Sequence, residues 1–137
     1  PVKRRRQRQM CIRDRSWGSL RLSEVDEPSL DQLSPEKLSL IESSFSKEFK
    51  DNIMEVTAYK CSTCHVMEPS WEGMKKPPKG VYLSEFSHLI NNYETIYKQV
   101  AASRAMPPGN ITFLEDEERL LYANLFHKIE EILREEK

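Results

Sequence analysis

Two cysteines and a histidine lie close together in the stretch AYKCSTCHVMEPSW, residues 58–71. Cys61 and Cys64 are three residues apart, and His65 follows directly. This Cys-x-x-Cys-His spacing is the attachment signature of c-type haem. A single helical turn can present both thiols to the two vinyl groups on one edge of a porphyrin, with the imidazole below the ring as an iron ligand. The pattern therefore predicts one covalent haem c, attached through Cys61 and Cys64 and ligated by His65.

A structural zinc site or a redox-active dithiol would use the same residue types. Zinc takes about four ligands, and outside the motif the sequence offers only Cys11, His88 and His127, which are widely separated. A thioredoxin-like dithiol would require a βαβ context, and no strand alternation surrounds the motif. Haem attachment is the favoured interpretation, and a structural zinc or haem module without a redox role stays open as an alternative.

A second iron ligand is predicted at Met106, in the loop AMPPGN. Two prolines stiffen this loop and the glycine after them permits a tight turn, so a thioether there is held in one place. Ligation by His and Met raises the reduction potential and leaves iron without an open site, which favours electron transfer over substrate turnover. Met67 lies too near His65 to reach the opposite face of the ring, and Met74 belongs to a looser, lysine-rich segment.

Helical spacing of apolar residues dominates the rest of the chain. It predicts helices over residues 34–48, 49–65, 84–103 and 114–137. Ser34 is the expected N-cap of the first helix, with Pro35 at its first position. Thr112 and Glu115 form a capping-box pattern before the last helix. Proline and glycine interrupt the chain between the helices, and no strand pattern or repeat is present, so the predicted fold class is all-α.

The order helix, Cys-x-x-Cys-His, irregular loop, helix, Met-Pro loop and C-terminal helix resembles a small class I cytochrome c domain. Over about residues 53–126 the chain is similar to the C-terminal cytochrome c domain of membrane-bound bacterial urate hydroxylases. The matching elements are CSTCH (61–65), PPKGV (77–81), MPPGNIT (106–112) and DEER (116–119). The resemblance implies an electron-accepting module. Urate chemistry in those proteins is assigned to a membrane domain N-terminal to the cytochrome, so urate oxidation by this chain is not implied.

The resemblance also implies where the haem pocket lies. In such domains a proline-containing loop after the motif flanks the haem, and one of its backbone carbonyls often accepts a hydrogen bond from Nδ1 of the proximal histidine. Pro78, Gly80 and Val81 are the candidates for this loop, and the sequence does not distinguish which carbonyl is the acceptor. Trp71 and Tyr97 are candidate pocket walls, with ordinary core packing as the alternative.

The first fifteen residues, PVKRRRQRQMCIRDR, hold seven Lys or Arg and one Asp, whereas the rest of the chain is acidic. This segment resembles a translated sequencing-adaptor fragment, and a disordered basic arm is the alternative. It is expected to lie outside the fold. We expect a linker and an extra helix over residues 16–48 and the cytochrome c domain over residues 49–137.

The sequence has no run of about 18 apolar residues and no secretory signal. Haem c is attached outside the cytoplasm, so we expect the domain in the periplasm or on the periplasmic face of the inner membrane, with its signal or anchor missing from this sequence. The expected partners are redox proteins or a membrane oxidoreductase domain, and not nucleic acid. A free-standing periplasmic cytochrome c is the alternative to a module of a larger oxidoreductase.

Overall fold

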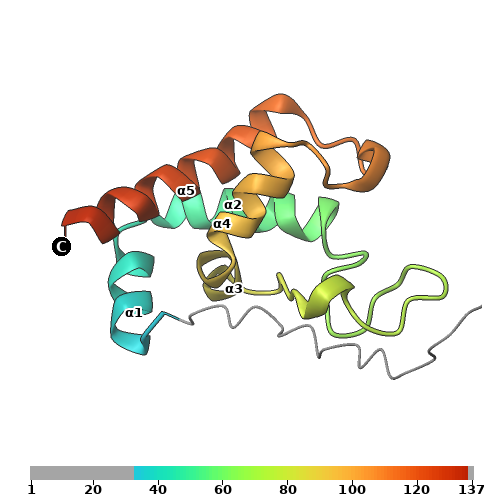
Figure 1. Cartoon of the computed structure of the whole chain (residues 1–137), viewed down its shortest axis with the longest axis horizontal. Helices are drawn as coiled ribbons and strands as arrows, with labels where there is room; N and C mark the ends of the chain where they lie inside the picture. The colour runs from blue at the N-terminus through green and yellow to red at the C-terminus, as the bar shows by residue number, and fades with distance from the viewer. Residues whose placement is uncertain (1–32, 136–137) are drawn as a thin grey trace, which may run out of the picture.

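The computed structural model describes residues 33–135, and within that range the chain is all-α, with no strand (Figure 1). This confirms the predicted fold class. The predictions for residues 1–15 and for the linker up to residue 32 lie outside the described residues. The five α-helices are α1 (Pro35–Ser43), α2 (Lys47–Lys60), α3 (Phe86–Asn91), α4 (Tyr93–Ile96) and α5 (Asp116–Glu135).

The first helix begins where its cap residues predicted. The Ser34 hydroxyl accepts the backbone N–H three residues on, at 3.4 Å, and Pro35 occupies the first helical position. Helix α1 packs against α3. Ile41 is fully buried there, and the Phe45 ring meets the edge of Phe86 with centroids 5.5 Å apart. The extra N-terminal helix therefore shares the core of the helices that follow it.

Helices α2 and α5 pack against each other and form the frame on which the candidate site is built (Figure 1). On α2 the buried side chains are Ile53 and Thr57, whereas Tyr59 is 74% exposed. Thr57 can take an inward position because its hydroxyl is satisfied by the Ile53 carbonyl. On α5 the buried residues follow helical spacing and are Arg119, Tyr122, Leu125 and Ile129.

The single helix predicted for residues 84–103 is broken twice. The Asn92 side chain donates to the His88 carbonyl at 2.8 Å, so it competes with the backbone at the junction of α3 and α4. After α4 the chain forms a π-helix, η2 (Tyr97–Ala102), whose wide turn is closed by the bond from Ser103 N to Lys98 O at 3.0 Å. The apolar face persists through both breaks, with buried side chains at Phe86, Leu89, Ile90, Ile96 and Val100.

The predicted cap of the last helix was misplaced by three residues. Helix α5 begins directly after Glu115, whose backbone N–H donates to the Glu118 carboxylate at 2.7 Å. Thr112 caps nothing, and its buried hydroxyl has no hydrogen-bond partner among the described residues. The reason is a preceding turn in which the Asn110 side chain pairs with both backbone groups of Leu114, so the chain enters the helix later.

Two loops lie at one end of the molecule, away from α1 and the C-terminal end of α5 (Figure 1). One follows α2 and contains the short 3-10 helix η1 (Pro78–Gly80), and the other leads from η2 to α5 and contains the 3-10 helix η3 (Pro108–Asn110). Among residues 33–135, no helix has both the length and the apolar character needed to cross a bilayer. The helical frame thus presents the Cys pair and Met106 on loops at the same end.

Candidate haem-attachment site

The Cys-x-x-Cys-His segment continues the hydrogen bonding of α2 for one more turn. The Cys61 amide donates to the Thr57 carbonyl at 2.9 Å, and the Cys61 carbonyl accepts from the amides of Cys64 at 3.2 Å and His65 at 3.0 Å. Both thiols are free and half-buried. This turn is the local arrangement that the spacing predicted.

The orientation of the His65 ring is fixed by a backbone carbonyl. Nδ1 of His65 lies 2.9 Å from the carbonyl oxygen of Val81. A carbonyl can only accept, so Nδ1 carries the proton, and the lone pair of the neutral ring is on Nε2. This is the partner that commonly orients a metal-ligating histidine. His65 is therefore prepared to ligate a metal through Nε2.

The turn Pro77–Val81 supplies that carbonyl. The amide of Gly80 donates to Pro77 O and the amide of Val81 donates to Pro78 O, each at 3.1 Å. Lys79 and Gly80 both have positive φ, at 53° and 66°. A side chain at position 80 would strain this backbone, so glycine suits the conformation there. Pro78 and Gly80 thus act on His65 through the turn that holds Val81.

The Met106 loop contains a Pro-Pro turn of the same kind as Pro77–Val81. Met106 is half-buried against the apolar core, and its amide donates to the Gln99 carbonyl at 2.9 Å, across the end of the π-helix. Pro107 is buried, and its carbonyl accepts from the amide of Asn110 at 2.9 Å. Two Pro-Pro turns therefore flank the site, one behind His65 and one directly after Met106.

Lys60 ties the Cys turn to the far end of the Met106 loop. Its ammonium donates to the Phe113 carbonyl at 2.9 Å and pairs with Glu118 at 3.5 Å.

Phe113 has a φ of 52°, which is unfavourable for a bulky residue. Such residues cost about 1–3 kcal/mol each and cluster where a structure holds a functional geometry. Among the described residues, every non-glycine position with positive φ lies in the two loops: Lys79, Arg104, Asn110 and Phe113.

A buried chain of hydroxyls ends at one of the two thiols. Thr57 donates to the Ile53 carbonyl at 2.7 Å, and its oxygen lies 3.0 Å from the Tyr122 hydroxyl, which lies 3.9 Å from Cys61 Sγ. Because the Ile53 carbonyl can only accept, the protons along the chain point toward it. Tyr122 then donates to Thr57, and the Cys61 thiol donates to Tyr122. Burial raises the pKa of Cys61 to about 11.

We expect this arrangement to make Cys61 slow to react in the haem-free chain. At pH 8 almost all Cys61 side chains are protonated thiols. The thiolate fraction rises roughly tenfold for each pH unit up to about pH 10, because the pKa of Cys61 lies above that range. Alkylation by iodoacetamide, followed at Cys61 by peptide mass mapping, should rise with pH at that rate. Unfolding in urea, which restores an ordinary thiol pKa, is the control. Equal rates in folded and unfolded chains at pH 8 would contradict the prediction.

The predicted pocket walls occupy different surroundings. Trp71 is 48% exposed on the loop after the Cys turn. Tyr97 stacks on Phe126 of α5, with centroids 4.1 Å apart and rings 10° from parallel, and so packs between η2 and α5. A haem-pocket role for either residue stays a prediction. His88 is half-buried in α3, and exposed His127 lies edge-on to Tyr97.

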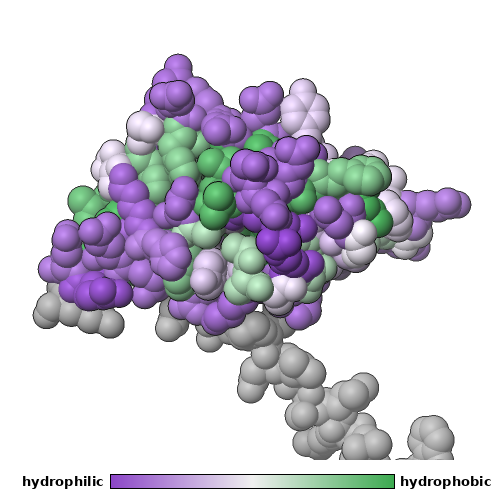
Figure 2. All heavy atoms as spheres, turned by 90° about the horizontal axis from the view of Figure 1, so that it is seen from above, coloured by the Kyte–Doolittle hydropathy of each residue, from purple (hydrophilic) through white to green (hydrophobic). Residues whose placement is uncertain are grey.

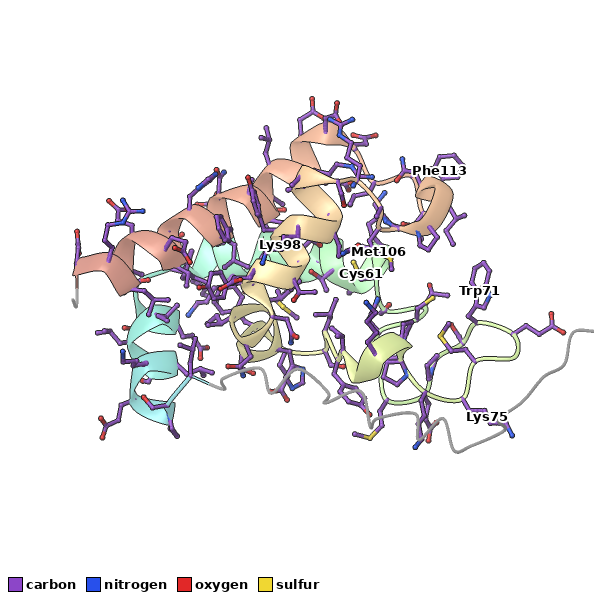
Figure 3. The ribbon with its side chains drawn as sticks, in the orientation of Figure 1. Cys61, Trp71, Lys75, Lys98, Met106 and Phe113 are labelled. Carbon is purple, nitrogen blue, oxygen red and sulfur yellow. The ribbon has the colours of Figure 1, made fainter. Side chains whose placement is uncertain are left out.

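Large apolar side chains are exposed on both loops at the site end of the molecule. Phe113 is 78% exposed, and Figure 3 shows Phe113 and Trp71 on the two loops at this end. Figure 2 shows apolar groups there beside a largely hydrophilic surface. A flat apolar cofactor suits such surroundings, since clustered exposed apolar side chains commonly mark a binding surface. The side chains that form this surface on the two loops are Trp71, Ile111 and Phe113.

The donor set fits a haem better than a closed zinc centre. Within residues 33–135 no three His, Cys, Asp or Glu side chains gather in a group that could hold a metal ion, whereas structural zinc takes about four such ligands. Cys61 and Met106 both pack against the same apolar core. Two thiols, one imidazole with a free Nε2 and one thioether are the side chains that covalent haem c with His and Met ligation requires.

Sequence reasoning missed several residues that build this site. The Lys60 ammonium donates to the Phe113 carbonyl, 53 positions away, and Thr57 and Tyr122 meet across 65 positions of sequence. The one local signal was the inward position of Thr57, four residues after Ile53 on α2.

Comparison of the chain with known proteins finds no matching family model, no matching curated protein and no matching solved structure.

Proposed function

We propose that the chain transfers single electrons through one covalently attached haem c. Cys61 and Cys64 would hold the porphyrin edge through thioether bonds, and His65 and Met106 would be the axial ligands. The observation that carries the proposal is the hydrogen bond from His65 Nδ1 to the Val81 carbonyl, at the end of a Cys-x-x-Cys turn. It leaves Nε2 as the ligating atom and fixes the plane of the ring.

The described residues supply what electron transfer needs from the protein. A bound haem c would supply one-electron exchange between ferric and ferrous iron. The two Pro-Pro turns restrain the backbone on both sides of the site, and Lys60 joins the Cys turn to the far end of the Met106 loop through the Phe113 carbonyl. Little reorganisation of these ligands is then expected when the charge at the site changes. A protein ligand on each side would leave no open position for a substrate, so we propose an electron-transfer role and not catalysis at the iron.

We propose a class I cytochrome c fold for the domain, and a place as the cytochrome module of a larger membrane-bound oxidoreductase of the urate-hydroxylase-like kind. The resemblance of the motifs at residues 61–65, 77–81, 106–112 and 116–119 supports this. On that basis the domain works in the periplasm or at the periplasmic face of the inner membrane. Its electron donor would be the membrane domain, and its acceptor another redox protein.

The decisive experiment is export of the chain in a bacterial host with haem c maturation, followed by intact mass and absorption spectra in both oxidation states. We expect a mass increase of one haem, a sharp α-band on reduction and the weak red sulfur-to-iron band in the ferric state. The Cys61→Ser, Cys64→Ser double variant is the control and should keep the apo mass.

A colourless wild-type chain at its apo mass would overturn the proposal, because the host supplies the machinery that attaches haem at Cys-x-x-Cys-His. Stoichiometric zinc in that colourless chain would favour the structural-module alternative. A covalent haem without the red band would keep the attachment and remove Met106 as a ligand.

A further inference from the structure

Arg119 is a buried cation that contacts the Met106 loop at three points. It is 6% exposed and lies in the second turn of α5. Its Nη1 donates to the carbonyls of Val100 at 2.6 Å and Met106 at 2.9 Å. Its Nη2 donates to the side-chain oxygen of Asn110 at 3.1 Å. One planar group thus binds the loop before, at and after Met106.

The three residues that supply these acceptors belong to different segments of the chain. Val100 lies in the π-helix η2, Met106 follows it, and Asn110 ends η3. Asn110 extends the network further, because the same oxygen accepts the Leu114 amide at 2.9 Å. Without Arg119, the carbonyl oxygens of Val100 and Met106 would lose the hydrogen-bond donor that the guanidinium provides. The loop therefore depends on Arg119 to pair these backbone groups.

The charge of Arg119 is balanced by hydrogen bonds instead of an ion pair. Among the described residues no carboxylate lies within ion-pair distance of it. A buried cation without a counter-charge is unfavourable unless well-placed acceptors replace its hydration. The guanidinium offers five N–H donors in a fixed plane, which a lysine ammonium cannot reproduce. The arrangement therefore fits arginine specifically.

Helix α5 connects the two halves of the candidate site. Arg119 and Tyr122 are three residues apart and lie on one face of the helix. Arg119 contacts the Met106 loop, and Tyr122 contacts Thr57 and Cys61 at the end of α2. Both side chains are anchored on a helix of 20 residues that is buried along this face. Helix α5 therefore sets the spacing between the Cys turn and the Met106 loop.

We propose that Arg119 is the positioning residue for Met106. From α5 it fixes the Met106 backbone and both flanks of the loop, so that the thioether is held at a set distance from the Cys61–His65 turn. The part that concerns ligation rests on the proposed haem function. The part that concerns the loop backbone does not depend on it.

The test uses the full chain carrying Arg119→Lys or Arg119→Gln, produced in the maturation host. Arg104→Lys is the matched control, because Arg104 lies on the same loop but is exposed and pairs with Asp116 at 3.0 Å. We expect both Arg119 variants to keep covalent haem, to lose the red sulfur-to-iron band and to bind cyanide about tenfold more tightly or more. The control should stay within about twofold of wild type.

A second readout needs no haem. Hydrogen exchange of the Met106 amide, which donates to Gln99, should become about tenfold faster or more in the Arg119 variants, while the amide of Cys61 on the other half stays within about twofold. Faster exchange at both amides would indicate general destabilisation and would overturn the positioning role. So would wild-type exchange at Met106, or an unchanged band and cyanide affinity in a haem-loaded variant.

Asn110→Gly decides the case if neither Arg119 variant folds. It removes one acceptor of the guanidinium together with the two hydrogen bonds of Asn110 to Leu114, and glycine tolerates the φ of 52° at that position. Faster exchange at Met106 supports the proposal, and exchange within about twofold of wild type overturns it. A wild-type chain without haem would defeat the proposed function alone, since the exchange measurement would still test the loop.

Discussion

The Met106→Ala protein is expected to keep its haem covalently attached but to lose the red sulfur-to-iron band and bind cyanide about tenfold more tightly or more. Attachment depends on Cys61 and Cys64, which the change does not touch. Ligation on the second face depends on a thioether, which alanine lacks. An exogenous ligand then meets no competitor at the iron. Optical titration of the ferric protein with cyanide, beside an intact mass, measures both effects.

Met67→Ala is the matched control for that variant. Met67 follows the Cys turn and is 75% exposed, so its removal should change neither the band nor the cyanide affinity. If Met106→Ala keeps the band and excludes cyanide like wild type, Met106 is not the ligand. Met74, half-buried in the loop after the Cys turn, would then be the next thioether to replace.

Ile53→Ala is expected to lower the free energy of unfolding by between about 2 and 5 kcal/mol, as large-to-small changes in a closed core do. Ile53 is fully buried on α2, and its carbonyl accepts the Thr57 hydroxyl. A cavity at this position would lie on the buried face of the helix that leads into the Cys pair. Urea unfolding followed by circular dichroism measures the change. For a domain near this size, each kcal/mol corresponds to about 4–8 °C in Tm.

Leu120→Ala provides the comparison on α5. Leu120 is 59% exposed, so the same kind of truncation should alter stability by about 0.5 kcal/mol or less. Equal losses in the two variants would mean that Ile53 is not in a closed core, and that the packing of α2 against α5 is looser than described. A loss confined to Ile53→Ala supports the frame on which the candidate site depends.

The two halves of the candidate site were predictable to different degrees. The Cys turn was recognised from five residues because its geometry is local: one helical turn fixes the relation of Cys61, Cys64 and His65. The partner of the His65 ring was predicted only as some carbonyl of the following loop. Which carbonyl it is depends on how the Pro77–Val81 turn folds back over 16 positions. No local pattern distinguishes Val81 from its neighbours.

Buried polar contacts were the hardest feature to foresee. Arg119 stands in an acidic stretch, DEER, where an exposed charge would be the ordinary expectation, yet it is buried and bonded to three acceptors. The break at Asn92 and the π-helix after it likewise interrupt a stretch with unbroken helical periodicity. In both cases a tertiary hydrogen bond or a side chain competing for a carbonyl overrode the local preference.

What the sequence by itself determined is local: the all-α class, the start of α1 at Ser34 and Pro35, the Cys turn and the two proline-rich interruptions. Each follows from short-range sterics, capping and periodicity, which act within a few residues. The tertiary structure alone decided which side chains join the halves of the site. Arg119 and Tyr122 find their acceptors only once α5 packs on α2 and η2, since burial removes water as the competing partner and makes each remaining hydrogen bond specific.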